Sequence, residues 1–133
     1  MSFGGGGNTY TMGGIASDAS RSAQTGPIEV VTTDANGNLA SDNGFFSRRV
    51  DELADGVAIA LAIEQPIFHN GQTFAMHFGY GNFDGTGAFG MSMAGIVDRG
   101  SFGSNSTVTV DAGVGVGADT GVVAAKGGLT FGW

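Results

Sequence analysis

Residues 34–38 have the spacing of the first half of a calcium-binding loop. They read Asp-Ala-Asn-Gly-Asn, so oxygen-bearing side chains recur at every second position, as in loops that bind Ca²⁺. The pattern breaks at Leu39, where such a loop needs glycine, and no bidentate glutamate follows at the required distance. The sequence therefore favours a solvated turn here over a metal site.

Residues 85–90 read Gly-Thr-Gly-Ala-Phe-Gly and match the spacing GxGxxG of dinucleotide-binding loops. That motif works only between a strand and a helix, inside a βαβ unit. Here a second strand is expected to follow, so we interpret the match as a glycine-rich strand start. The sequence Asn105-Ser106-Thr107 also matches a glycosylation acceptor, a pattern that arises by chance in Ser/Thr-rich loops.

Three ionisable side chains stand alone among small residues. His77 is expected to be a satisfied interior residue rather than a ligand. Asp111 and Lys126 are expected on one face of neighbouring strands, where an ion pair between them could be structural, dock a helix or act as a gate. No Ser/His/Asp arrangement has a recognisable spacing, so we predict no catalytic, cofactor-binding or metal-binding residues and no enzyme.

The composition excludes several classes of protein. The chain has 133 residues, 26 of them glycine, no cysteine, and a net charge of −7 with only five Lys and Arg residues. Glycine without a G-X-Y period excludes collagen, and the lack of cysteine excludes disulfide frameworks and thiolate sites. So few basic residues argue against a nucleic-acid partner. The length allows one domain, or a small domain with a tail.

The chain divides into three segments by composition. Residues 1–41 are polar and rich in glycine, with a short strand possible around Val30. Residues 42–65 are expected to form a helix, capped near Asp42 and ended by Pro66. Its apolar residues step by four and three and form a heptad seam: Phe46, Val50, Leu53, Val57 and Ala60. The first half of this helix looks solvated and the second half enclosed.

Residues 72–133 alternate with period two over four stretches, which predicts a four-stranded antiparallel meander. One face is small or polar and is expected to line a lumen: His77, Gly79, Gly81, Gly90, Asp111, Gly113, Gly115, Gly117 and Lys126. The other is large and apolar and is expected to face lipid: Phe74, Met76, Phe78, Tyr80, Met91, Met93, Val110, Val114, Leu129 and Phe131. A soluble sheet would carry charges on its solvent face, whereas strands of this length with charge-free apolar faces are typical of membrane β-barrels.

Four strands cannot close a barrel, and an open edge in hydrocarbon leaves unpaired backbone groups. If these strands span a membrane, several chains must share one barrel. Two chains give eight strands and three give twelve, and the helix at residues 42–65 is the natural filler for the lumen. Three helices with a heptad seam need the wider barrel, so the trimer is favoured.

Residues 47–133 resemble the C-terminal membrane anchor of trimeric autotransporter adhesins, the YadA-like anchor family. The resemblance rests on RVDELADGVAIALA at residues 49–62, four glycine-rich strands, the GVGVG stretch at 113–117, and the ending Thr-Phe-Gly-Trp. It implies a homotrimeric, twelve-stranded all-β barrel in the outer membrane of a Gram-negative bacterium, with three helices in its lumen. It also implies that the outer-membrane assembly machinery reads Trp133, and that the barrel holds and translocates an N-terminal passenger at the cell surface.

An alternative remains open. A glycine-rich β subunit of a secreted or surface fibre, joined through its strand edges, would have a similar composition. Residues 1–14 show no basic start or apolar stretch, so an exported protein is expected here in mature, trimmed or recombinant form. Any ligand of residues 1–41 stays unidentified by the sequence.

Overall fold

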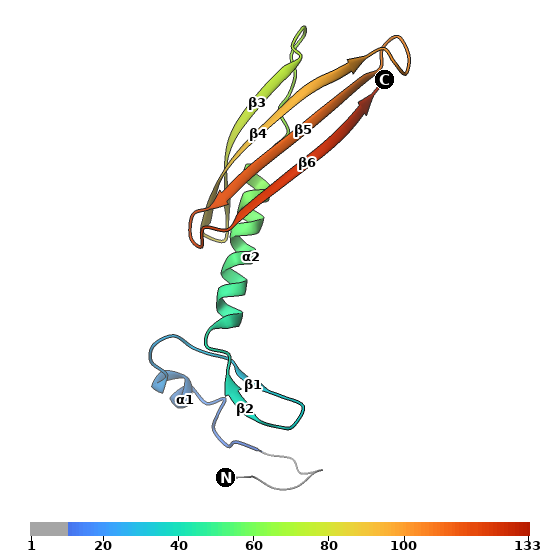
Figure 1. The fold of residues 1–133 in the computed structure, drawn as a ribbon. Coiled ribbons are helices and arrows are strands. Elements are labelled where there is room, and N and C mark those ends of the chain that lie inside the picture. Colours follow the sequence, from blue (N-terminus) through green and yellow to red (C-terminus); the bar gives the residue numbers. More distant parts are fainter. Residues whose placement is uncertain (1–10) are drawn as a thin grey trace. The chain divides into compact units, whose positions relative to one another are not determined.

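The computed structural model describes residues 11–133. The chain divides into two compact units, Met1–Gly44 and Phe45–Trp133, which are described separately (Figure 1). The first ten residues of the predicted polar segment lie outside the described residues.

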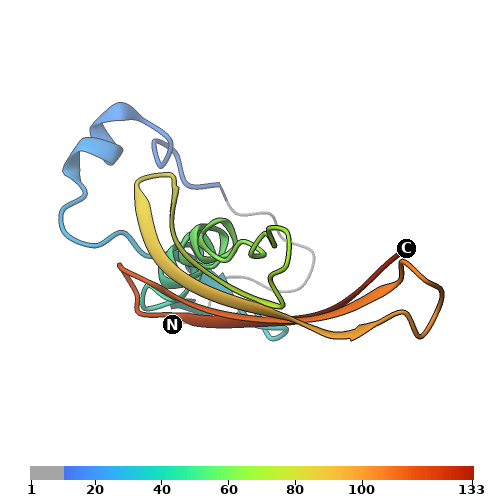
Figure 2. The same cartoon turned by 90° about the horizontal axis from the view of Figure 1, so that it is seen from above.

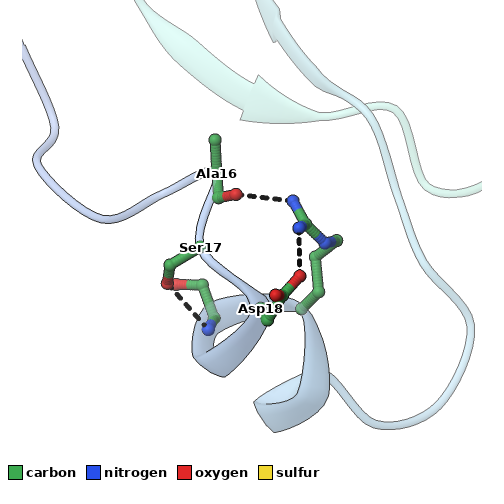
Figure 3. A network of polar contacts seen from close by, with 5 residues as sticks. Ala16, Ser17 and Asp18 are labelled. Carbon is green, nitrogen blue, oxygen red and sulfur yellow. Dashed lines mark hydrogen bonds and ion pairs between the residues drawn. The ribbon is translucent and has the colours of Figure 1, made fainter.

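The first unit contains a six-residue helix, α1 (Asp18–Ala23), and a two-stranded antiparallel sheet. Ser17 begins the helix, since its hydroxyl accepts a hydrogen bond from the N–H of Ser20 at 3.1 Å, which satisfies one of the free donors of the first turn. Arg21 closes the turn by donating to the Ala16 carbonyl at 2.5 Å and pairing with Asp18 (Figure 3). The sheet joins β1 (Val31–Thr33) to β2 (Leu39–Ser41).

The second unit begins with helix α2 (Phe45–Ala62). The helix starts three residues later than the sequence pattern suggested, because Asn43 and Gly44 both have positive φ angles, 50° and 71°, and a right-handed helix cannot contain them. It ends four residues before Pro66, and Ile63 still donates to the Ile59 carbonyl at 3.0 Å. Among residues 11–133, no helix is both long enough and apolar enough to cross a membrane.

Four strands follow in an antiparallel meander, as the period-two alternation predicted. They are β3 (Phe74–Phe83), β4 (Thr86–Arg99), β5 (Thr107–Gly117) and β6 (Val123–Gly132), in the spatial order β3-β4-β5-β6. Asp84 and Gly85 form the two-residue turn between β3 and β4, both with positive φ (50° and 84°), as a tight hairpin requires. One register shift lies in β4, between Ile96 and Asp98.

The sheet curves around α2, which lies on its concave side (Figure 2). We call the face that packs on α2 the inner face and the opposite face the outer face. The core is small and sits where the second half of α2 meets the sheet, with Ala58, Ile59, Ile63 and Ala88 buried. No barrel closes within one chain: β3 and β6 are the edges of the sheet, each with a single neighbouring strand in the described part of the molecule.

Candidate functional site

The inner face of the sheet is the region where the predicted lumen residues gather. Its glycines stand where a side chain would collide with α2. A Cβ built at Gly90 would lie 2.7 Å from the Ala62 carbonyl oxygen, and Cβ atoms at Gly79 and Gly81 would collide with the Ala62 and Ala58 carbonyls. The backbone of α2 therefore approaches the strands closely, which only glycine permits.

Three glycines of β5 receive three side chains of α2 in turn. A Cβ at Gly113 would collide with Ile63, one at Gly115 would lie 2.7 Å from Cγ2 of Ile59, and one at Gly117 would collide with the Asp55 carboxylate. The helix residues are spaced by four and the strand residues by two. Four helical residues rise about 6.0 Å and two strand residues about 6.6–6.8 Å, so the two spacings nearly match. We call this arrangement the glycine ladder.

Asp55 is the charged member of the ladder, and its side chain is fully buried. The backbone N–H of Thr120, in the β5–β6 turn, donates to Oδ2 at 2.7 Å, and the Thr120 hydroxyl donates to the same oxygen. Oδ1 is buried and has no hydrogen-bond partner among the described residues. A buried charge is expensive unless it is paired, so Thr120 is the contact that makes this position tolerable for a carboxylate.

The other end of the ladder holds the carbonyls of Ile63 and Glu64, the two residues that follow α2. Nζ of Lys126 donates to the Ile63 carbonyl at 2.8 Å, and the Ser92 hydroxyl donates to the Glu64 carbonyl. Helix ends leave such carbonyls without intrahelical partners, and here the sheet supplies the donors. The suggested ion pair between Asp111 and Lys126 is not formed in the described chain, because Lys126 reaches toward the helix.

Asp111 and His77 lie on the inner face beyond the end of α2. Asp111 sits opposite Gly128 in the register, where a Cβ would lie 2.6 Å from Oδ2 of the carboxylate. His77 places Nε2 3.9 Å from Oε2 of Glu64, while its Nδ1 is buried without a hydrogen-bond partner in the described part of the chain. Neither residue lies in a group of ligands: residues 11–133 hold no cluster of three His, Cys, Asp or Glu side chains that could share a metal ion.

The outer face carries the large apolar side chains that the sequence assigned to lipid. All of them except half-buried Met91 are at least 40% exposed in the single chain. Phe78 reaches 71%. Tyr80 and Phe89 pack together with ring centroids 5.3 Å apart, and the Tyr80 ring covers the backbone of Gly87. So extensive an exposed apolar surface marks an interaction site in a folded protein.

The heptad seam of α2 lies on the side of the helix away from the ladder. With about 100° of rotation per residue, Val57 points about 160° away from Asp55. Phe46, Val50, Leu53 and Val57 are 41% to 69% exposed in the single chain, and Ala60 is also exposed. The expected enclosure of the second half of the helix therefore holds on the ladder side alone, and a second apolar stripe is exposed to solvent in the single chain.

The C-terminus forms an aromatic cluster with the loop between β4 and β5. Phe102 and Phe131 meet edge-to-face with centroids 6.1 Å apart. Together with Trp133, which is 95% exposed, they border a cavity of about 270 Å³. Trp133 is thus the most exposed of the large apolar residues assigned a role by the sequence.

The two motif matches near turns are used structurally. Asp34 accepts hydrogen bonds from the N–H groups of Asn36 and Asn38, both at 2.9 Å, and from the Asn38 side chain at 2.7 Å. The Asn38 amide and the backbone donors hold the pKa of the Asp34 carboxyl below its usual value. Both carboxylate oxygens are thus occupied within the turn. Gly85 belongs to the β3–β4 hairpin and a strand follows it, so the βαβ context of a dinucleotide site is not present there.

Sequence reasoning missed the polar residues that anchor α2, namely Asp55, Thr120 and Ser92. In the sequence, Asp55 looks like one of the solvated charges that lie off the heptad seam. One signal was available: Asp55, Ile59 and Ile63 recur every four residues on the face opposite the seam, and Asp55 is the charged residue among them.

Comparisons with protein-family models, curated proteins and solved structures find no match.

Proposed function

We propose that this chain is one third of an outer-membrane β-barrel that anchors an N-terminal surface segment and lets it cross during biogenesis. Three copies of the β3–β6 sheet would pair edge to edge into twelve strands around three α2 helices. The work is physical: strand closure supplies a pore, and the helices then fill it. No reacting group is needed for this role.

One observation carries the proposal: the sheet presents opposite chemistries on its two faces and curves around a helix that exposes an apolar stripe. The inner face is adapted to α2 by glycine, while the outer face exposes large apolar side chains. The heptad seam faces away from the ladder, where two further helices would bury it. The edges β3 and β6 would pair with neighbouring copies, which removes the unpaired backbone groups that lipid does not tolerate.

Oligomeric mass in detergent tests the proposal. We expect the purified chain to need detergent for solubility, and unheated samples to give three times the monomer mass by light scattering with the detergent contribution subtracted. Heating in SDS should convert the trimer to monomer with loss of β-structure. A folded monomer in detergent would overturn the proposal, as would detergent-free fibres, which would support the fibre-subunit alternative.

The seam supplies a matched pair of variants. Leu53→Asp places a charge in the stripe that the helices would share, and should abolish the trimer. Asp51→Asn, on the same helix at an exposed position, should leave the trimer mass unchanged. Trimers that carry Leu53→Asp would show that the helices do not meet along the seam.

A further inference from the structure

Asp55 determines how far α2 sits along the sheet. We infer this from the repetitive construction of the glycine ladder, in which the same kind of contact recurs at Gly113, Gly115 and Gly117. Repeated apolar contacts of nearly equal spacing do not by themselves select one position. A polar member that finds its partner at a single step can select it.

A slip of one step preserves the spacing of the ladder, while it breaks the hydrogen bonds from Lys126 and Ser92 and brings the end of α2 to His77 and Asp111. The slip would move α2 by four residues along β5, away from the β5–β6 turn. It would carry Ile59 from Gly115 to Gly113 and Asp55 from Gly117 to Gly115. The displacement is about 6 Å, the rise of four helical residues. Residues 64–73 connect α2 to β3 without helix or strand, so this connection can absorb the change.

The slipped position is unfavourable because of Asp55. At Gly115 its carboxylate would enter a site bordered by the Phe89 carbonyl oxygen, which lies 2.9 Å from a Cβ built there, and by Ile59, which would have moved with the helix to the place of Ile63. A carbonyl oxygen cannot donate to a carboxylate. Lys126 lies opposite Gly113, one step from this site, and in the observed position it donates to the Ile63 carbonyl. The Thr120 donors stay behind at the β5–β6 turn.

Asp51 makes this inference testable, because it lies one step before Asp55 on the helix. In the slipped position Asp51 would occupy the place beside Gly117 and Thr120. A chain with leucine at position 55 would then again have a carboxylate at Gly117 and apolar side chains at Gly115 and Gly113. Asp55→Leu is therefore expected to shift the helix by one step into the slipped position. The shift should be favoured by Asp51, which would replace Asp55 beside Thr120.

Disulfide trapping measures the position of the helix, since the chain has no cysteine of its own. The pair Ile63→Cys with Gly113→Cys reports the observed position. The pair Ile63→Cys with Asp111→Cys reports the slipped position, because residues on one face of β5 are spaced by two and the slip carries residue 63 from Gly113 to Asp111. Intrachain disulfides formed by mild oxidation of the folded protein in detergent are scored by mass spectrometry after denaturation.

We expect Asp55→Leu to raise the ratio of slipped to observed cross-link at least about tenfold, because the buried carboxylate no longer opposes the slip. Asp55→Ala should act in the same direction and serves if the leucine variant does not fold. Asp55→Asn keeps an acceptor for Thr120 and should leave the ratio unchanged. Asp51→Leu should also leave it unchanged, and combining it with Asp55→Leu should reduce the slip.

Asp55→Leu and Asp55→Ala proteins that trap only the observed position would overturn the inference. A double variant that slips as much as Asp55→Leu alone would do so as well. These outcomes depend on contacts within one chain and not on the trimer mass, so they are distinct from failure of the proposed function. The biological consequence does rest on that function: the position of α2 sets how far the N-terminal segment stands outside the barrel.

Discussion

Replacing Gly115 by alanine tests whether glycine is required for the close approach of α2. The added Cβ would lie 2.7 Å from Cγ2 of Ile59 and 2.9 Å from the Phe89 carbonyl oxygen. Cγ2 of Ile59 moves only if χ1 changes, which a helix restricts for a β-branched side chain. The Phe89 carbonyl is part of β4 and cannot move without disturbing the hydrogen bonds between the strands. Gly115→Ala should therefore destabilise the fold by about 1–3 kcal/mol per chain, the usual cost of overpacking.

Gly127→Ala is the matched control in the neighbouring strand. A Cβ there would lie 3.6 Å from the Asp111 carbonyl oxygen, an ordinary contact distance. The effect should stay within about 0.5 kcal/mol of wild type, as for most surface substitutions. Gly115→Leu should be more harmful than Gly115→Ala, whereas Val114→Leu on the outer face should be nearly silent.

Guanidinium unfolding in detergent, followed by circular dichroism at a fixed protein concentration, gives the comparison. The order of stability should be wild type and Gly127→Ala first, then Gly115→Ala, then Gly115→Leu. If Gly115→Ala is as stable as Gly127→Ala, then α2 does not pack against Gly115 in solution. If both alanine variants are equally destabilised, then these glycines serve strand curvature rather than helix contact.

Three further outcomes are expected. Met91→Arg or Val114→Arg should block assembly, at a cost of about 2–4 kcal/mol per chain near the bilayer midplane, and native gels that show wild-type amounts of trimer would contradict the outward assignment. Deleting Trp133 should lower the amount of protein in the outer membrane of cells while refolding in detergent is retained; fractionation and surface labelling measure the first, and unchanged surface levels would count against the proposed signal. The turn at Asp34 should lose stability as pH falls, because hydrogen bonds from Asn38 lower the pKa of this carboxyl. The stabilisation by the ionised carboxylate is complete above the pKa of the unfolded chain, about 3.9. It disappears as pH falls through the lower pKa of the folded chain. Carbon-detected NMR titration should show the Asp34 pKa rising toward its ordinary value in Asn38→Ala, and an unchanged pKa would contradict the assigned cause.

The strands and their faces could be predicted because period-two alternation is a local property. From residue 72 onward nearly every second residue is either large and apolar or small, so the meander and its two faces follow directly. The start of α2 was harder to predict. Several residues near Asp42 are suitable helix caps, and the sequence does not show that Asn43 and Gly44 adopt positive φ angles. The turn signal at Asp34 was interpreted correctly, since its hydrogen bonds join residues only two and four positions apart.

The contacts that anchor α2 are long-range, and this is why the sequence did not reveal them. Asp55 looks like an ordinary solvated carboxylate until the β5–β6 turn is brought to it. The Asp111 and Lys126 ion pair was a reasonable expectation for neighbouring strands, but strand pattern alone cannot show that a helix carbonyl competes for the lysine. The alternation places residues on a face; it does not say which helical residue meets which strand residue.

The polar contacts of α2 also dictate an order of events during folding. Asp55 and Thr120 are 65 residues apart, and Lys126 and the Ile63 carbonyl are 63 apart. Contacts between such distant residues carry a large loop-closure cost and form slowly. Thr120 and Lys126 lie in the last third of the chain, and this part leaves the ribosome long after α2. The helix therefore cannot complete its attachment until the final hairpin exists, and whatever precedes it in the chain stays untethered until that moment.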